Sequence, residues 1–397
     1  MRNIFIAGST GSIGKNALNV IAGYPDKLSA KAMAAGHFTD ELKEQILLFK
    51  PSYCVLSTKA ESNKAKESLK NFKGVKTKFT SGEEGFREVI LKGGLDIILN
   101  AISGSSGLML SYMSLAAGKD LALANKESMV MAGDILNRTA KSFNAKIIPV
   151  DSEHSALFQC LRCGAKSDVK KLILTASGGP FYNKDKTDFE NITVDMALNH
   201  PKWKMGKKIT IDSSTLANKG LEIIEACYLF NIDEKQVDVL IHPQAAVHSM
   251  VEFNDGSIMA QMGAADMKGP IGYALSYPRR FKGLMKPINL AEIGRLDFFA
   301  PDNEKFPFLN LARYAIKTGK SMPAVFCVAN EFFVNSFLEG KISFNKIAVN
   351  VDKVMKSHKL FNLSAIEDVI EAKNQAESLS KGEVFHLKVE KFLTEKI

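Results

Sequence analysis

The chain has 397 residues, of which 46% are hydrophobic and 24% are charged, a composition that excludes a disordered or fibrous protein and, at roughly 100–200 residues per domain, predicts two or three domains. The formal net charge of +9 indicates either an anionic partner or an ordinary solvated basic surface. The basic residues are spread along the chain and no apolar run approaches the roughly 20 residues of a membrane span, so we expect neither a nucleic-acid nor a membrane partner.

Short apolar segments alternate with helical patterns over residues 1–150. Continuous apolar strands that alternate with helices predict a parallel sheet with both faces covered, so the expected fold class is α/β with a Rossmann-like N-terminal domain. The predicted helices are Gly14–Ala22, Thr39–Phe49 and one that starts near Ala60. The predicted strands are Asn3–Ala7, Leu28–Ala34, Tyr53–Leu56, Val75–Phe79, Leu95–Ala101, Leu121–Ala124 and Lys146–Val150.

A glycine-rich segment, Gly8-Ser9-Thr10-Gly11-Ser12-Ile13-Gly14, joins the first predicted strand to the first helix. Glycine allows a tight turn and a close approach of the backbone to a pyrophosphate, and the helix N-terminus offers N–H groups to the phosphates. The G-x-x-G-x-x-G spacing is a variant of the dinucleotide fingerprint, so we expect a dinucleotide here. The alternative is a glycine turn that serves only the packing of helix on strand.

The end of the second predicted strand indicates which dinucleotide is bound. NAD-binding proteins place an acid there to hold the ribose 2′-hydroxyl. Here the strand is followed by Gly36, His37 and Phe38, with no carboxylate before Asp40. The missing acid favours NADP.

Two acids follow the strand Lys146–Val150. Asp151 and Glu153 are two residues apart, so in an extended chain they point the same way and suit Mg²⁺ or Mn²⁺. The alternative is a pair of solvated loop acids.

Glu222 lies in the first turns of a predicted helix, with Glu225 one turn later, and either could be an ordinary acid at a helix start. Glu222 is the better candidate for a third ligand, because it lies nearer Asn218 and Lys219.

The middle region is expected to be α+β, with a strand at Lys171–Thr175 and a hairpin whose strands, Val247–Phe253 and Ser257–Met262, flank Asn254-Asp255-Gly256. Several of its loops carry hydroxyl, amide and ammonium groups suited to a phosphate, although each alone could be an ordinary loop. Trp203 belongs either to a loop that closes over a substrate or to the core. The groups are Ser177-Gly178-Gly179, His200–Gly206, Asp212–Thr215 and Asn218-Lys219.

The remaining segments complete a three-domain division. Residues 1–150 are expected to bind the dinucleotide, 151–277 to bind metal and substrate, 278–308 to connect, and 309–397 to form a helical domain. Within the last, Ser364–Glu367 predicts a capping box. The five cysteines are odd in number and sparse, which favours a reducing, cytoplasmic location, with Cys160 and Cys163 one turn apart on a helix.

Seven segments in this order resemble the 1-deoxy-D-xylulose 5-phosphate reductoisomerase family. The resemblance implies a homodimeric, NADPH-dependent enzyme with Mg²⁺ or Mn²⁺. It would convert a phosphorylated sugar, 1-deoxy-D-xylulose 5-phosphate, into 2-C-methyl-D-erythritol 4-phosphate in non-mevalonate isoprenoid synthesis. The segments are Gly8–Gly14, Ala124–Glu127, Pro149–Ser155, Ala176–Phe181, His200–Gly206, Ile211–Ala226 and His242–Val251.

The resemblance also implies roles for individual residues. The implied metal ligands are Asp151, Glu153 and Glu222, which with Lys219 form the catalytic group. The implied substrate contacts are Lys126, Ser152, Ser177, His200, Trp203, Ser213, Asn218 and Lys219 together with Glu153 and Glu222. The implied NADPH contacts are Thr10, Gly11, Ser12, Ile13, Gly36, His37, Phe38, Asn125, Glu127, Met205 and Gly206, with Trp203 and Met205 on a closing loop.

Two departures from the family pattern stand out. Phe38 replaces the usual Asn beside the cofactor ribose, and because Phe cannot donate a hydrogen bond to a 2′-phosphate, His37 or backbone N–H groups must compensate. Ala265-Asp266-Met267 replaces a Pro-Asp-Met turn. The alternatives are another NADP-linked dehydrogenase, which would need no divalent metal, and a non-catalytic dinucleotide sensor, which would need no convergent acids.

Overall fold

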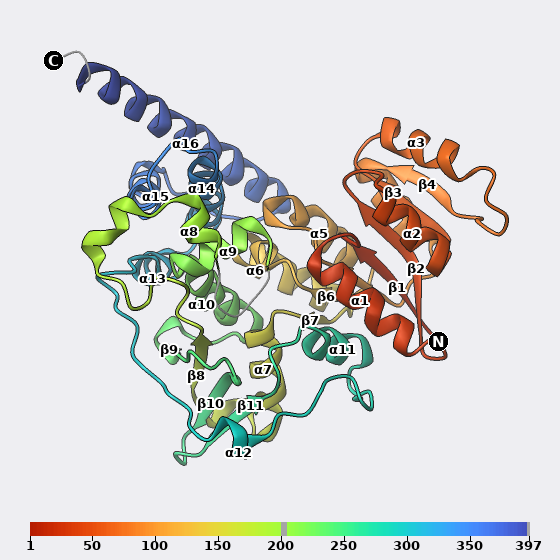
Figure 1. Ribbon diagram of the computed structural model, residues 1–397, viewed down its shortest axis with the longest axis horizontal. Helices are drawn as coiled ribbons and strands as arrows, with labels where there is room; N and C mark the ends of the chain where they lie inside the picture. Colours follow the sequence, from red (N-terminus) through yellow and green to blue (C-terminus); the bar gives the residue numbers. More distant parts are fainter. Residues whose placement is uncertain (200–204, 395–397) are drawn as a thin grey trace. The chain divides into compact units, whose positions relative to one another are not determined.

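The computed structural model describes the backbone of residues 1–199 and 205–394 and the side chains up to residue 385 within those ranges. The chain forms two compact units, which are described separately (Figure 1). The first unit comprises Met1–Asn125, Leu136–Phe158 and Asp266–Ile288, and the second comprises Lys126–Ile135, Gln159–Ala265 and Asn289–Ile397. No helix in the described part of the chain is long and apolar enough to cross a membrane.

The first unit is built on a parallel sheet of seven strands in the order β4-β3-β2-β1-β5-β6-β7. The prediction of a parallel α/β sheet is therefore confirmed. The predicted strand Val75–Phe79 begins later than expected, since Val75 packs as a loop residue against the core beside α2. The strands are β1 (Arg2–Ala7), β2 (Leu28–Ala35), β3 (Tyr53–Leu56), β4 (Lys78–Ser81), β5 (Ile97–Asn100), β6 (Asp120–Leu123) and β7 (Ile147–Pro149).

Helices separate these strands along the chain, and their apolar residues form cores with the sheet. In α3, for example, the buried residues Ser62, Ala65 and Leu69 recur at helical spacing, which leaves the opposite side of the helix to solvent. The helices are α1 (Ser12–Gly23), α2 (Asp40–Phe49), α3 (Lys59–Leu69), α4 (Gly82–Lys92), η1 (Gly104–Gly107), α5 (Leu108–Ala116), the end of α6 (Lys126–Ser142) and most of α7 (Ser152–Cys160).

A late segment of the chain also folds with the first unit. Helix α11 (Lys268–Ser276) packs on α1, and its buried Ile271, Ala274 and Leu275 join the core formed by β1 and β2. The turn that precedes α11 is held by Asp266, whose side chain accepts the backbone N–H of Lys268 at 2.9 Å. The turn thus forms although alanine replaces the family's proline at position 265.

The second unit contains a four-stranded sheet in the order β11-β10-β8-β9. The predicted hairpin is confirmed: β10 pairs antiparallel with β11, and Gly256 in the turn has a φ of +87°, which glycine adopts without strain. Helix α10 packs on β8 and β9. The strands are β8 (Val169–Ala176), β9 (Val237–Ile241), β10 (Val247–Phe253) and β11 (Ile258–Met262).

Helices make up the rest of the second unit, and α14 packs against α13, α15 and α16. The expected capping box differs in detail, because Asp368 rather than Glu367 reaches back to accept the N–H groups of Ser364 and Ala365. Cys160 ends α7 and Cys163 lies in the next turn. The helices are η2 (Leu161–Cys163), η3 (Lys166–Asp168), η4 (Lys186–Asn191), α8 (Val194–Leu198), α9 (Lys207–Ser214), α10 (Ala217–Phe230), η5 (Glu234–Gln236), α12 (Leu290–Ile293), α13 (Phe308–Thr318), α14 (Met322–Leu338), α15 (Lys346–Ser357) and α16 (Ile366–Thr394).

Candidate active site

The glycine-rich segment forms the turn between β1 and α1 in the first unit. Gly8 has a φ of +84°, and a Cβ there would lie 2.6 Å from the carbonyl oxygen of Ala101. A Cβ on Gly14 would lie 2.2 Å from the carbonyl oxygen of Gly8. Helix α1 starts at Ser12 behind Gly11, which has no side chain to cap the first-turn N–H groups. The turn therefore offers backbone donors at a helix N-terminus, as an anionic phosphate requires.

The segment after β2 carries the expected ribose contacts. Gly36 and His37 are exposed, whereas the Phe38 side chain is buried in the core with Leu42 and Leu56. The backbone N–H of Phe38 donates to Glu61 Oε2 at 2.6 Å. Sequence reasoning missed Glu61, because it belongs to α3 and follows a different strand.

Asn125 ends the loop after β6 and is buried in the first unit. Its side-chain amide donates to the carbonyl oxygens of Ile102 and Gly104, both at 2.8 Å. A Cβ on Gly107 would lie 2.7 Å from the Asn125 side chain, so glycine is required there. Asn125 therefore joins the loops that follow β5 and β6 at the carboxyl edge of the sheet, where α/β folds bind ligands.

Asp151 and Glu153 lie just after β7, at the same edge of the sheet. The sequence analysis expected an extended chain here, and this expectation is wrong, because Ser152 begins α7. Asp151 and Glu153 nevertheless offer carboxylate oxygens within 4.8 Å of each other. His154, which the sequence reasoning did not single out, is fully buried with Nδ1 3.9 Å from Asp151 Oδ2.

A buried polar cluster in the second unit brings together Lys126, Asn218, Lys219 and Glu222. Lys126 Nζ donates to Asn218 Oδ1 at 2.6 Å and lies 3.2 Å from Glu222 Oε1. Lys219 Nζ contacts the other oxygen of Glu222 at 2.5 Å and the carbonyl oxygen of Thr175 at 2.6 Å. The four residues come from the start of α6 and the first turns of α10, so the structure assembles four predicted site residues that are up to 96 positions apart.

The remaining hydroxyl candidates lie near this cluster in the fold of the second unit. Ser177 follows β8, and its Oγ accepts the backbone N–H of Gly179 at 3.4 Å. A Cβ on Gly179 would lie 2.7 Å from the carbonyl oxygen of Ser213, so the turn after β8 packs directly on the end of α9. The structure thus brings the segments of Ser177 and Ser213 together.

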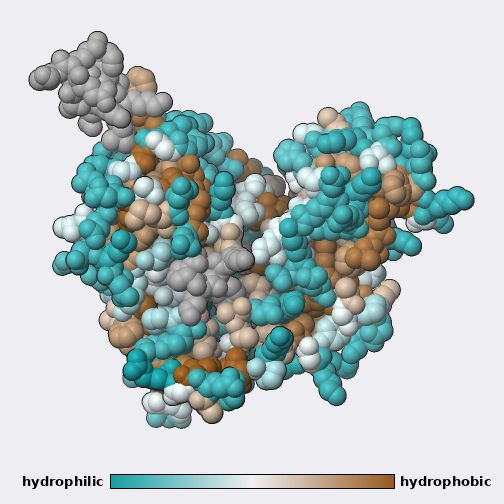
Figure 2. Space-filling model, viewed as in Figure 1, coloured by the Kyte–Doolittle hydropathy of each residue, from teal (hydrophilic) through white to brown (hydrophobic). Residues whose placement is uncertain are grey.

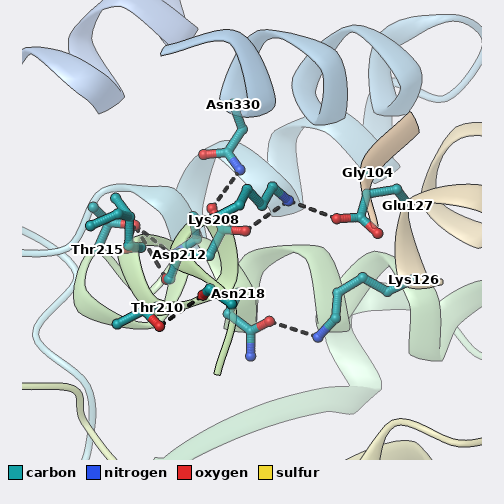
Figure 3. Close-up of polar contacts among 12 residues, drawn as sticks. Gly104, Lys126, Glu127, Lys208, Thr210, Asp212, Thr215, Asn218 and Asn330 are labelled. Atoms are coloured by element: carbon teal, nitrogen blue, oxygen red, sulfur yellow. Dashed lines mark hydrogen bonds and ion pairs between the residues drawn. The ribbon is translucent and has the colours of Figure 1, made fainter. Parts of the chain in front are cut away.

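A second buried network holds the starts of α6 and α9, as Figure 3 shows. Lys208 Nζ contacts Glu127 Oε1 and Asp212 Oδ2, each at 2.7 Å, and Asn330 of α14 donates to Asp212 Oδ1 at 2.8 Å. Burial opposes the charge on Lys208, but the two carboxylates outweigh it and raise the pKa of the ammonium group. Burial likewise opposes the charge on Glu127, but Lys208 outweighs it and lowers the pKa of that carboxyl group.

Sequence reasoning missed Lys208, Asp212 and Asn330 as parts of a network. Lys208 and Asp212 stand four apart on α9, a helical spacing that could have suggested an ion pair, but nothing in the sequence connects Asn330 to them. Glu127, expected to contact the cofactor, has its Oε1 engaged by Lys208.

The predicted closing loop is only partly described. His200 and Trp203 lie outside the described residues. Met205 is half-buried, and Gly206 immediately precedes α9, where its carbonyl oxygen accepts the Thr210 hydroxyl at 2.9 Å.

Three family models match the chain. They are 1-deoxy-D-xylulose 5-phosphate reductoisomerase over residues 4–133, its C-terminal domain over residues 147–230, and the DXP reductoisomerase C-terminal domain over residues 262–379.

Curated relatives of this chain have the same name as the matching family model. The 1-deoxy-D-xylulose 5-phosphate reductoisomerase of Thermodesulfovibrio yellowstonii is 47% identical over 97% of this chain and 100% of its own length. That of Endomicrobium trichonymphae is 47% identical over 94% of this chain and 96% of its own length.

Solved structures agree with these matches. A DOX-P reductoisomerase in complex with NADPH, fosmidomycin and magnesium superposes with a TM-score of 0.91 at 38% identity, covering 98% of this chain and 99% of that one. The enzyme from Zymomonas mobilis in complex with NADPH gives a TM-score of 0.89 at 36% identity, covering 96% of this chain and 99% of that one.

Proposed function

Since the chain belongs to the 1-deoxy-D-xylulose 5-phosphate reductoisomerase family, we propose that it rearranges 1-deoxy-D-xylulose 5-phosphate and reduces the product with NADPH to 2-C-methyl-D-erythritol 4-phosphate. This step belongs to non-mevalonate isoprenoid synthesis. The observation that carries the proposal is the buried cluster of Lys126, Asn218, Lys219 and Glu222, in which two ammonium groups share one carboxylate. A cluster with this excess of positive charge suits an anionic, oxygen-rich substrate.

The first unit fits a dinucleotide. At Gly8 and Gly14 a Cβ would lie less than 3 Å from backbone atoms, so this tight turn needs glycine at both positions. The turn leads into the uncapped start of α1, whose N–H groups can bind the pyrophosphate of the dinucleotide. NADPH supplies the hydride that reduces the rearranged aldehyde. We assign the NADPH contacts to Thr10, Gly11, Ser12, Ile13, Gly36, His37, Phe38, Asn125, Glu127, Met205 and Gly206.

The donor set fits a divalent cation. Asp151 and Glu153 offer two carboxylates near each other after β7, and Glu222 offers a third that is held by lysines and an amide. Oxygen-only donors suit Mg²⁺ or Mn²⁺. We assign all three as metal ligands; the ion, when bound, acts as a Lewis acid toward the carbonyl and hydroxyl oxygens of the substrate.

The other polar residues would bind and orient the sugar phosphate. Lys219 is fixed between Thr175 and Glu222, so its ammonium group is oriented before the substrate arrives. Lys126 and Ser152 would contact substrate hydroxyls. The proposed phosphate and substrate cradle is Ser177, His200, Ser213, Asn218 and Lys219, with Trp203 and Met205 on a loop that excludes water.

The functional division of the chain follows the same assignment. Residues 1–150 would bind NADPH, 151–277 metal and substrate, 278–308 would connect, and 309–397 would support the site. The contact of Asn330 with Asp212 supports the last point, because it ties α14 to α9 beside the cluster.

A homodimer is the proposed assembly. In the second unit α10 packs on one face of the four-stranded sheet, whereas Ile173, Val247 and Met250 form only a small cluster with partly buried neighbours. Figure 2 shows apolar side chains at the surface around α12, and in the same unit Leu290 of α12 and Ile258 of β11 are 59% and 51% exposed. A second copy packed on this face would cover them. Light scattering that gives a monomer mass at micromolar concentration would contradict the dimer.

A cytoplasmic location is proposed because all five cysteines are free thiols, as in a reducing compartment. Enzyme activity recovered from the soluble cytoplasmic fraction would support this location, and recovery from an oxidising compartment would contradict it.

The activity is tested by following NADPH absorbance with 1-deoxy-D-xylulose 5-phosphate and Mg²⁺ or Mn²⁺, and by identifying the product by mass spectrometry. We expect oxidation that depends on the substrate, stops with EDTA and returns with Mn²⁺. Turnover that persists in EDTA would instead favour an ordinary NADP-linked dehydrogenase, and no turnover at saturating metal would remove the proposal.

A further inference from the structure

The segment that follows β2 lies where this fold binds the adenosine ribose. β2 is next to β1 in the parallel sheet, and the N–H groups of Gly8 and Ser9 both donate to the carbonyl oxygen of Ala34, at 2.9 Å each. The phosphate-binding turn and the end of β2 are therefore joined. In dinucleotide-binding sheets, the side chains at this strand end decide between a ribose 2′-hydroxyl and a 2′-phosphate.

An acid occupies this position although none follows β2 in the sequence. Glu61 lies in the first turn of α3, directly after β3, which pairs with β2. Its Oε2 accepts the N–H of Phe38 at 2.6 Å, and its Oε1 lies 3.7 Å from His37 Nδ1. The Glu61 carboxylate thus engages the two residues that follow Gly36.

Two of the groups that could hold a 2′-phosphate, the Phe38 N–H and the Lys64 ammonium group, are already engaged. The Phe38 side chain is 7% exposed and faces the core, so it offers no polar group, and its N–H is taken by Glu61. Lys64, one turn further along α3, donates to the carbonyl oxygen of Phe38 at 3.4 Å. The hydrogen bond from Phe38, followed by the nearby charges of Lys64 and His37, lowers the pKa of Glu61, so the carboxylate is ionised at neutral pH.

We propose that Glu61 weakens the preference of this chain for NADPH over NADH by accepting the ribose 2′-hydroxyl of NADH and opposing the 2′-phosphate of NADPH. The inference rests on the proposed function, since it requires that the first unit binds a nicotinamide dinucleotide. NADPH remains the expected coenzyme, but its 2′-phosphate must compete with Glu61 for His37 and the Phe38 N–H. The preference for NADPH over NADH is therefore weaker than it would be with a neutral residue at position 61.

The test compares equilibrium binding to the full chain without substrate. Isothermal titration gives dissociation constants for NADPH, NADH, adenosine 2′,5′-bisphosphate and AMP. Glu61→Gln removes the charge but keeps an oxygen that can accept the Phe38 N–H. Glu67→Gln is the matched control, since Glu67 lies on the same helix, is 72% exposed and pairs with Lys70, the residue that caps the end of the helix.

We expect Glu61→Gln to tighten NADPH and the bisphosphate about tenfold relative to NADH and AMP, as the removal of one nearby like charge predicts, and Glu67→Gln to leave the ratio unchanged. An NADPH-to-NADH ratio that is the same in the wild type and in Glu61→Gln would overturn the role of Glu61 while leaving the proposed function intact. Failure of the wild type to bind either dinucleotide would instead contradict the proposed function itself.

Discussion

Lys126 Nζ lies 3.2 Å from Glu222 Oε1, and both side chains are almost completely buried. Lys126 is the first residue of α6 and Glu222 lies in the first turns of α10, so the pair joins the starts of two helices in the second unit. Because Lys219 and Asn218 contact the same carboxylate, the side chains are oriented before any ligand binds. Preorganised charge of this kind stabilises charge that develops during a reaction.

Replacing Glu222 by Gln is expected to reduce turnover about a hundredfold or more, because it removes a proposed metal ligand. The dissociation constant of NADPH should change less than about twofold, since most of the proposed NADPH contacts, including the glycine turn, belong to the other unit. Steady-state turnover and NADPH fluorescence measure the two effects. Glu339→Gln, at a 57% exposed acid of the same unit, is the control. An equal loss of NADPH affinity would count against the assignment of Glu222.

Gly14→Ala is expected to abolish measurable NADPH binding or to prevent folding of the first unit. The added Cβ would lie 2.2 Å from the Gly8 carbonyl oxygen and 2.5 Å from Ser9 Cα, and both are backbone atoms that cannot move independently. The control is Gly23→Ala on the same helix, where nothing lies within 4 Å of the new Cβ. Gly23→Ala should stabilise the protein by up to about 1 kcal/mol in urea unfolding. Normal NADPH affinity in Gly14→Ala would show that the turn has room for a side chain at this position, contrary to the distances given above.

Phe38→Asn would introduce the residue that the family usually has at this position, but here we expect it to destabilise the protein by about 3 kcal/mol. The substitution removes a ring that packs with Leu42 and Leu56 and leaves a polar amide in an apolar core. Urea unfolding measures the loss. His37→Asn, at an exposed neighbour, should change stability little. An unchanged midpoint for Phe38→Asn would show that the side chain does not belong to the core.

Lys208→Met is expected to destabilise the protein by about 3 kcal/mol, because it leaves the carboxylates of Glu127 and Asp212 buried without their cation. Lys356→Met, which removes a 72% exposed partner of Asp352, should have little effect. Urea unfolding of both variants at neutral pH gives the comparison. Equal stabilities of the two variants would contradict a structural role for the network.

The same network predicts a pH dependence. The folded state lowers the pKa of Glu127 below 4.5, so its contribution is complete above about pH 4.5 and is lost as the pH falls through the lower folded value. The folded state raises the pKa of Lys208 above 10.5, so that contribution is lost only in strong alkali. The stability difference between the wild type and Lys208→Met should be largest at neutral to alkaline pH. It should shrink as the pH falls, because burial without Lys208 raises the pKa of Glu127 and the variant regains stability when that carboxylate takes up a proton. A difference that grows in acid would reverse this sign.

Much of the fold could be predicted from the sequence because the signals are local. Strand Tyr53–Leu56 is a continuous apolar run that ends at polar residues, and the hairpin at Gly256 needs only a turn glycine between two strands. Capping is less well determined: Asp368 and Glu367 are both acids near the helix start, and backbone geometry selects Asp368. The core position of α11 could not be predicted, because it depends on packing between segments about 250 residues apart.

The site residues that belong to sequence motifs could be predicted. Those that only the tertiary fold brings together were missed. Lys126, Asn218, Lys219 and Glu222 stand in motifs, and the structure assembles them. Asp151 and Glu153 lie near each other although the expected extended chain is a helix start. Glu61 and Asn330 reach their partners only through the pairing of β2 with β3 and the packing of α14, which no local pattern encodes.

The central claim is that Asp151, Glu153 and Glu222 bind one cation in an NADPH-dependent reductoisomerase. Anomalous diffraction at the manganese edge, from crystals grown with NADPH, 1-deoxy-D-xylulose 5-phosphate and Mn²⁺, tests it most directly. The account predicts a single manganese peak coordinated by all three carboxylates. A manganese ion coordinated by other residues, or by Asp151 and Glu153 without Glu222, would contradict the account.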